Sequence, residues 1–160
     1  MGAQIIQAPL RQKIEGRLSF FLAGTMSPDS QIGWRPVLID ETFSDLPITV
    51  FDPTRLDWDE TWREDFSDAR WVEQIQWELD MQELADVVVV FLGDTSVAPI
   101  SMLELGLNAK SGKVLVCAMP RFAKRGNVEA ICARYHVPLV SCVEDLQSAI
   151  KDILAKHSIL

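Results

Sequence analysis

The chain has 160 residues, of which 48% are hydrophobic, and its formal net charge is −8 at pH 7. This length and apolar share fit one globular domain with a sizeable core, and they exclude wholesale disorder. The acidic balance argues against nucleic acid or an anionic membrane surface as a partner, because phosphate binding requires a basic face.

The apolar stretches and the cysteines indicate in which cellular compartment the protein is expected. Apolar runs such as Val87–Leu92 are far too short to span a bilayer, and the N-terminus lacks the long apolar core of a signal peptide. The sequence has three cysteines, Cys117, Cys132 and Cys142. Their odd number and the lack of a CxxC pair favour free thiols. We therefore expect a cytoplasmic protein without a metal site or cofactor.

Strand and helix patterns alternate along the chain. Residues 1–15 are mixed and polar, which indicates a loose arm or an edge strand. We expect strands at residues 19–24, 48–51, 86–92, 113–119 and 138–140, and helices at residues 34–43, 71–84, 100–110, 127–135 and 143–159. This alternation predicts an α/β fold of one domain over residues 1–160: a flavodoxin-like, doubly wound sandwich around a five-stranded, mainly parallel sheet.

Local signals predict where several elements begin and end. Gly24 ends the first core strand, Ser111 and Gly112 end the helix before the fourth strand, and Asn127 is a fair N-cap for the next helix. On the helix over residues 71–84, one face is formed by Trp71, Ile75, Leu79 and Gln82, with Glu78 beside it.

One carboxylate, Glu104, stands in an otherwise apolar helical stretch. The core strand over residues 86–92 precedes it, and the intervening polar loop carries Asp94. Ligands of open α/β sheets bind at the carboxyl ends of strands, where such loops lie. Glu104 could be a surface residue of an ordinary helix, or it could be a carboxylate in a strand-end pocket.

The other acids allow two interpretations as well. Glu78 could be solvent-exposed or close to a pocket, Asp86 could cap the segment before its strand, and Asp94 could form a turn.

The glycines exclude two nucleotide motifs. Only Gly24 and the distant Gly33 follow the first strand, so a dinucleotide fingerprint is absent, as is a phosphate loop.

Residues 52–70 combine many acids with aromatic side chains, among them Trp58 and Trp62. The segment is too polar for a core strand and too aromatic for a disordered linker. It could form an interface patch. Alternatively it could be a lid whose aromatic rings stack on a flat ligand.

Several short motifs, in this order and spacing, resemble one known family. They are Phe21-Leu22-Ala23-Gly24, Trp34-Arg35, Asp52-Pro53-Thr54-Arg55, Ala85-Asp86-Val87-Val88-Val89, Glu104-Leu105-Gly106 and Gly126-Asn127-Val128. The chain is similar over residues 18–140 to the nucleoside 2-deoxyribosyltransferases, whose fold is flavodoxin-like. The resemblance implies cleavage of the N-glycosidic bond of 2′-deoxynucleosides and transfer of the deoxyribosyl group to another nucleobase.

The resemblance also implies roles for individual residues. Glu104 would be the nucleophile that forms a covalent deoxyribosyl ester. Glu78 and Asp94 would position the sugar hydroxyls and the base, and Asn127 would complete the site of a neighbouring subunit. The residues expected to contact substrate are Phe20, Gly24, Trp34, Trp58, Trp62, Asp86 and Asn127.

One departure from the family concerns the nucleophile. Family members often carry a tyrosine on the first strand that hydrogen-bonds the catalytic glutamate, but the matching position here is Phe20. The partners implied are nucleosides, nucleobases and further copies of the chain, in a dimer-based assembly or a hexamer. A 5′-nucleotide N-glycosidase and a nucleoside-binding module without turnover are the alternative functions.

Overall fold

The computed structural model describes residues 2–25 and 33–160. Within these residues, six strands form one parallel sheet in the order β1-β3-β2-β4-β5-β6. The strands are β1 (Gln4–Gln7), β2 (Ser19–Gly24), β3 (Thr49–Asp52), β4 (Val87–Leu92), β5 (Val114–Ala118) and β6 (Leu139–Val140). From β3 to β6 this is the flavodoxin-like order that the sequence predicts.

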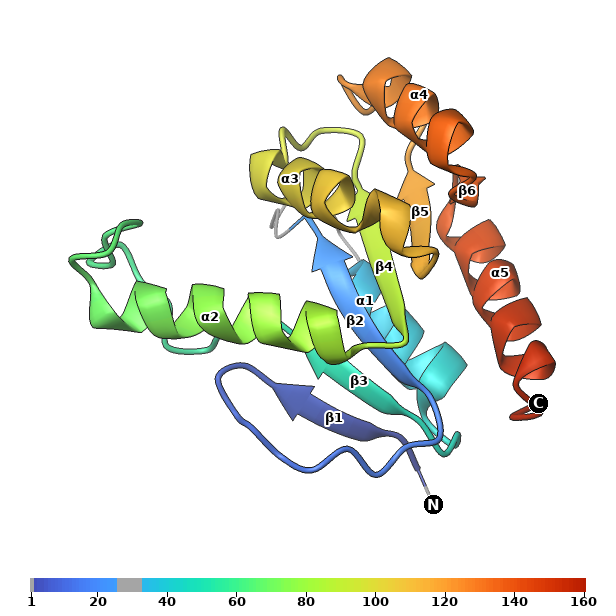
Figure 1. The fold of residues 1–160 in the computed structure, drawn as a ribbon, viewed down its shortest axis with the longest axis horizontal. Helices are drawn as coiled ribbons and strands as arrows, with labels where there is room; N and C mark the ends of the chain where they lie inside the picture. The colour runs from blue at the N-terminus through green and yellow to red at the C-terminus, as the bar shows by residue number, and fades with distance from the viewer. Residues whose placement is uncertain (1, 26–32) are drawn as a thin grey trace.

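Helices cover both faces of the sheet (Figure 1). They are α1 (Trp34–Val37), continued by a π-helix over Leu38–Phe43, α2 (Ala69–Leu84), α3 (Pro99–Asn108), α4 (Arg125–Tyr135) and α5 (Val143–Lys156). One buried cluster joins the sheet to α2, α3 and α4, and a second joins it to α1, the π-helix and α5. Because the central strands are buried on both faces, they consist of continuous apolar runs.

The sheet has one strand more than the five expected. The additional strand is β1, which pairs with β3 from Gln4↔Thr49 to Gln7↔Asp52. The edge-strand interpretation of the N-terminal residues is therefore the one that the structure supports. Its sequence, Gln-Ile-Ile-Gln, is short and half polar, as is typical of a sheet edge.

One local prediction, the N-cap of the helix after β5, is wrong. Helix α4 begins at Arg125, with Lys124 at the N-cap position, so Asn127 is inside the first turn. On α2 the buried side chains are Gln74, Trp77, Met81 and Gln82. Leu79 is 36% exposed, because the apolar contacts of α2 run through Trp77 to the rings of β2 and β3.

The carboxyl ends of β2 and β3 open toward α2 and α3, which lie side by side in front of the sheet (Figure 1). Gly24 ends β2 with φ 144°, and a Cβ there would lie 2.5 Å from the carbonyl oxygen of Phe91. A side chain at this position would therefore clash with β4. None of the helices in residues 2–25 and 33–160 is long and apolar enough to cross a membrane.

Candidate active site

A cleft of about 710 Å³ lies at these strand ends. Its walls come from five parts of the chain: the end of β2, the start of α1, the segment after β3, the N-terminal half of α2 and the start of α3. The residues that line it are Ala23, Gly24, Thr25, Arg35, Pro53, Arg55, Trp58, Glu64, Trp71, Gln74, Ile75, Glu78, Ala98, Pro99, Ile100, Ser101 and Glu104. It is therefore where the topology of an open α/β sheet favours a ligand.

Glu104 projects into the cleft from the second turn of α3. Burial, and next the negative charge of Glu78, raise the pKa of Glu104 to about 8, and the charge of Arg35 and a hydrogen bond from Gln82 oppose this rise. A carboxyl group with a pKa this far above its ordinary value, in a cleft, is a candidate for nucleophilic or acid–base chemistry.

Glu78 reaches the same cleft from α2. Its Oε1 accepts a hydrogen bond of 2.9 Å from Nε2 of Gln74, which also donates to the carbonyl oxygen of Pro53 at 2.9 Å. Burial raises the pKa of Glu78 above its ordinary value, against the effects of Gln74 and of the positive charge of Arg35. The cleft therefore holds two carboxyl groups whose ionisation is disfavoured.

Arg35 supplies the buried positive charge of the site. The guanidinium donates to the carbonyl oxygens of Leu22 at 3.0 Å and Gly24 at 3.1 Å, and its Nε lies 3.9 Å from Oδ1 of Asp52. Burial lowers the pKa of Arg35 to about 10, although the charges of Asp52, Glu104 and Glu78 oppose this change. The guanidinium thus stays charged at neutral pH and offsets part of the negative charge of the two glutamates.

A pair of buried amides holds the Glu104 side chain. Gln82 on α2 donates from Nε2 to Oε2 of Glu104 at 2.5 Å. Asn108 on α3 donates from Nδ2 to Oε1 of Gln82 at 2.8 Å, and to the backbone oxygen of Glu104 at 2.9 Å. These contacts fix α2 against α3 at the level of the cleft.

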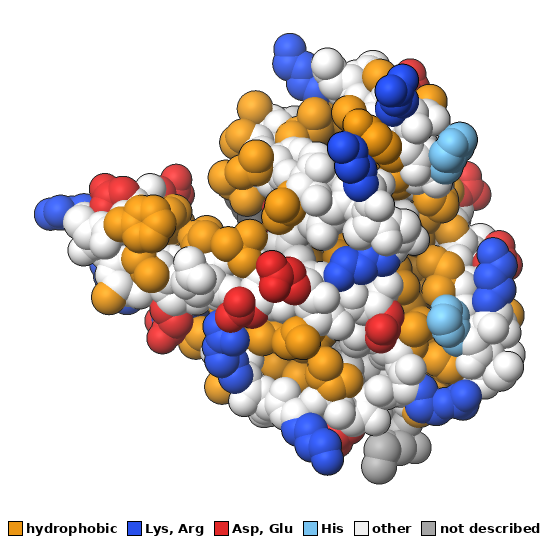
Figure 2. Space-filling view, in the orientation of Figure 1, with side chains coloured by type: hydrophobic (Ala, Val, Ile, Leu, Met, Phe, Trp, Pro, Cys, Tyr) orange, Lys and Arg blue, Asp and Glu red, His pale blue; other side chains and the backbone are white. Residues whose placement is uncertain are grey.

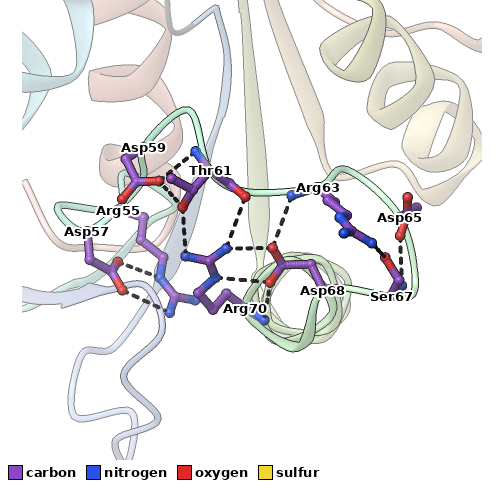
Figure 3. A network of polar contacts seen from close by, with 9 residues as sticks. All are labelled: Arg55, Asp57, Asp59, Thr61, Arg63, Asp65, Ser67, Asp68 and Arg70. Atoms are coloured by element: carbon purple, nitrogen blue, oxygen red, sulfur yellow. Dashed lines mark hydrogen bonds and ion pairs between the residues drawn. The ribbon is translucent and has the colours of Figure 1, made fainter.

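The acidic segment (residues 53–68) forms the outer wall of the cleft and is rigidified by its own charges (Figure 3). Asp68 caps α2 by accepting from the backbone N–H of Arg70, and its carboxylate pairs with the Arg70 guanidinium at 2.7 Å. A second ion pair joins Nε of Arg55 to Oδ1 of Asp57 at 2.7 Å. The alternating acids are therefore mainly turn and cap residues of an ordered loop.

Two tryptophan rings pack together within this segment. The rings of Trp58 and Trp62 are tilted by 39°, with 4.6 Å between their centroids, and the guanidiniums of Arg55 and Arg70 lie 4.7 and 5.1 Å from the centroid of the Trp62 ring. Trp62 is buried in this cluster, whereas Trp58 is half exposed and lines the cleft. Packing against Trp62 thus holds the ring of Trp58 at the cleft.

A family model described as nucleoside 2-deoxyribosyltransferase like matches residues 17–122. The chain belongs to this family. The matched range runs from the start of β2 to the turn after β5 and includes every residue that lines the cleft. A search of curated proteins found no match.

The structure brings together four of the site residues predicted from the sequence. They are Gly24, Trp58, Glu78 and Glu104, and all of them line the cleft. In this family member the nucleophile candidate and the second acid therefore come from two neighbouring helices.

Two of the predicted acids lie outside the cleft lining. Asp94, in the loop after β4, accepts from the backbone N–H of Arg121 at 2.7 Å, and its other oxygen is 3.6 Å from the Arg121 guanidinium. Asp86 lies at the opposite end of β4 and accepts from the backbone N–H and hydroxyl of Ser19 at 2.8 and 2.7 Å. Asp86 thus ties β4 to the start of β2.

Three aromatic or amide candidates are also absent from the cleft lining. Phe20 is fully buried in the second core cluster, with its ring 4.9 Å from that of Phe43. Trp34 is buried against Phe91, with ring centroids 5.0 Å apart. Asn127 is exposed on the first turn of α4.

Sequence reasoning missed Arg35, Gln74, Gln82 and Asn108 as site residues. For Arg35 a signal existed, because a Trp-Arg pair follows the loop after a glycine-ended strand. The three amides gave none, because a helical glutamine or asparagine is ordinarily a surface residue. Within the described ranges, no group of three histidine, cysteine or acidic side chains is placed to hold a metal ion.

Proposed function

We propose that the protein transfers a 2-deoxyribosyl group from one nucleobase to another, with Glu104 as the nucleophile. The observation that carries the proposal is a half-buried carboxyl group at the strand ends, hydrogen-bonded to Gln82 and close enough to a second acid, Glu78, for its charge to act on it. Family membership supplies the reaction class.

The reaction has two displacements. The Glu104 carboxylate attacks C1′ of the nucleoside, the C1′–N bond breaks, and the base leaves with the bonding electron pair and takes up a proton. A nitrogen of the incoming base then attacks C1′, breaks the ester to Glu104 and loses its proton. Two displacements through an oxocarbenium-like state replace one difficult displacement.

Glu78 is the candidate source of the proton. Burial raises the pKa of Glu78 above its ordinary value, which favours the protonated form that a proton donor needs. Because two neighbouring carboxyl groups resist ionising together, the pair retains one proton over a range of pH, and the proposed reaction uses the form in which this proton is on Glu78 and Glu104 is ionised. Glu78 in this way can also position a sugar hydroxyl, as the family resemblance suggests.

The charges around the cleft favour an uncharged nucleoside over a 5′-nucleotide. The described lining carries three carboxyl groups, those of Glu64, Glu78 and Glu104. Its two guanidiniums are engaged: Arg35 with backbone carbonyls and Asp52, and Arg55 with Asp57 and Glu73. A phosphate would therefore meet repulsion without an uncommitted cation from these residues.

The remaining candidates have secondary parts in the proposal. Trp58 would stack on the base, because it presents a half-exposed ring to the cleft. Asp94 would handle the base only after exchanging its bonds to Arg121.

The outer face of α3 supports an assembly of several copies. Its exposed apolar side chains are Ile100 (56% exposed), Leu103 (70%) and Leu107 (62%). Hydrophobic side chains gather on this part of the surface in Figure 2. Because Ile100 also lines the cleft, a second copy seated on α3 would border the active site, and Asn127 could then belong to a neighbour's site.

The decisive experiment is base exchange with purified protein, deoxyinosine and free adenine, followed by chromatography. We expect deoxyadenosine to appear faster than free deoxyribose, and Glu104→Gln to abolish it. Glu144→Gln, on the exposed side of α5, is the matched control and should retain full activity. Full activity of Glu104→Gln would remove Glu104 from the mechanism.

The same experiment separates the alternatives. Release of deoxyribose without exchange would identify a hydrolase, and a deoxynucleoside monophosphate that outcompetes the nucleoside would identify a nucleotide N-glycosidase. Thermal stabilisation by nucleosides without any product would indicate a binding module.

A further inference from the structure

Glu104 needs a partner that fixes its orientation. A glutamate side chain has three rotatable bonds, and a displacement of the reacting atom by about 1 Å can cost 10²-fold in rate. The family resemblance places a tyrosine for this purpose at the position of Phe20, but Phe20 carries no hydroxyl and packs against Phe43 in the core. The one tyrosine of the chain, Tyr135, ends α4, where it contacts Lys110.

We propose that Gln82 is the positioning residue of Glu104 and that Asn108 sets the direction of the Gln82 amide. The three residues form a closed ring. It runs from the Glu104 backbone oxygen to Asn108, from Asn108 to Gln82, and from Gln82 back to the Glu104 carboxylate. The inference rests on the proposed function, because it assigns a task within that mechanism.

Hydrogen-bond donors and acceptors allow this ring only one direction. The Glu104 backbone oxygen can only accept, so the amide nitrogen of Asn108 must face it. That nitrogen uses its second hydrogen on Oε1 of Gln82, which turns the Gln82 nitrogen toward Oε2 of Glu104. The ring thus presents a donor to the carboxylate and favours its ionised form.

The ring is sheltered from water. Gln82 is 2% exposed and Asn108 is 7% exposed, so neither amide has bulk water as an alternative partner. The main chain of Gln82 is anchored as well, since Nζ of Lys113 donates to its carbonyl oxygen at 2.5 Å. A buried, fully oriented donor costs little reorganisation during the reaction.

The two carboxylate oxygens of Glu104 thereby have different roles, one in positioning the side chain and the other in the reaction. Oε2 accepts from Gln82, and the hydrogen bonds among the described residues leave Oε1 for the attack on C1′. The charged groups that act on this carboxylate are Glu78 from α2 and Arg35 from α1, which shift its pKa in opposite directions.

The first test is Gln82→Met, which keeps the length and volume of the side chain but removes the donor. We expect kcat for base exchange to fall 10- to 100-fold while KM changes less than about 3-fold, because the substrate contacts are intact. Gln147→Met is the matched control. Gln147 is a partly buried glutamine of α5 that donates to Glu41 and Thr42, away from the cleft, so its loss should leave kcat unchanged.

The second test reverses the ring. Asn108→Asp has no side-chain N–H to donate to Gln82, so the Gln82 nitrogen should turn toward the introduced carboxylate and present its oxygen to Glu104. We expect kcat to fall at least as far as in Gln82→Met, and the double variant to lose no more than the worse single variant. Additive losses, or an unchanged kcat in either single variant, would overturn the inference.

A readout that needs no activity separates this inference from the proposed function. In ¹³C-glutamate NMR, the Glu104 carboxyl resonance, assigned with Glu104→Gln, should titrate at higher pH in Gln82→Met than in the wild type. An unshifted titration would overturn the ring. Inactivity of the wild type with nucleosides would instead overturn the transferase while leaving the titration interpretable.

Discussion

Glu78 on α2 and Glu104 on α3 line the same cleft, and the negative charge of Glu78 disfavours the ionisation of Glu104. Burial acts in the same direction on both carboxyl groups, and for each it is the largest cause of the raised pKa. The two groups therefore titrate as a pair rather than independently. A nucleophile must be ionised and a proton donor must not be, so this coupling bears directly on the reaction.

The coupling predicts the pH dependence of activity. In the proposed mechanism the pair must hold one ionised and one protonated carboxyl group, so kcat/KM should be bell-shaped: low at acidic pH, where both groups are protonated, and falling above about pH 8, where the pair loses its last proton. In Glu78→Gln only Glu104 titrates, so activity should be lower and the fall above pH 8 should disappear. Steady-state kinetics between pH 5 and 9 measure both curves. A fall above pH 8 that persists in Glu78→Gln would contradict the coupling.

The raised pKa also predicts a dependence of stability on pH. In the unfolded chain the pKa of Glu104 is near its ordinary value of 4.5, and in the folded protein it is about 8. Between pH 4.5 and pH 8 the folded state binds the Glu104 proton more tightly than the unfolded state does. The resulting contribution to the free energy of unfolding is fully present below pH 4.5 and is lost as the pH rises to 8. Glu104→Gln removes this loss.

We expect Glu104→Gln to have a free energy of unfolding similar to the wild type at pH 5. At pH 8.5 it should be more stable by an amount on the order of 2–4 kcal/mol. Urea unfolding at the two pH values measures the difference, with Glu144→Gln as the control. A variant that is less stable than the wild type at pH 8.5 would show that the Gln82 contact outweighs the cost of burying the charge.

The core of this fold could be predicted because burial on both faces leaves a direct trace in the sequence. The runs over Val87–Leu92 and Val114–Ala118 are continuous apolar strands, and the helices between them are periodic. The edge strand Gln4–Gln7 could only be suggested, because its pairing with β3 depends on partners 45 residues away. The helical period alone does not identify the buried face of α2, since Trp71 and Leu79 satisfy it as well as the buried Trp77 does.

For the site, the sequence singles out side chains whose burial is costly. Glu104 and Glu78 could be found because each is an acid within or beside an apolar face. Gln82 and Asn108 could not, because their importance comes from the approach of α2 to α3, 26 residues apart in the chain. Trp58 and Trp62 were both suggested as ligand contacts, but only the fold decides which ring faces the cleft.

The exposed ring of Trp58 predicts a contribution to substrate affinity. Trp58→Ala should raise KM for nucleosides about 3- to 10-fold, because one aromatic stacking contact is worth about 0.5–1.5 kcal/mol. Phe66→Ala is the matched control, since Phe66 is an 81% exposed ring of the same segment outside the cleft lining. Initial rates at varied deoxyinosine concentration measure the effect, and an equal change in both variants would indicate a general loosening of the segment.

The apolar face of α3 predicts that the protein self-associates. Leu103 is 70% exposed between Ile100 and Leu107, so Leu103→Asp places a charge at the centre of this face. We expect the wild type to run as an oligomer in size-exclusion chromatography with light scattering, and the variant to run as a monomer, because an interface of apolar side chains does not tolerate an unpaired carboxylate.

The control for this change is Leu160→Asp, which charges a leucine that is 61% exposed at the end of the chain and should leave the assembly intact. If the partner copy completes the cleft next to Ile100, Leu103→Asp should also lose base exchange while keeping the wild-type circular dichroism spectrum. A monomeric wild type would refute the assembly. A monomeric but fully active variant would show that one chain holds the complete site.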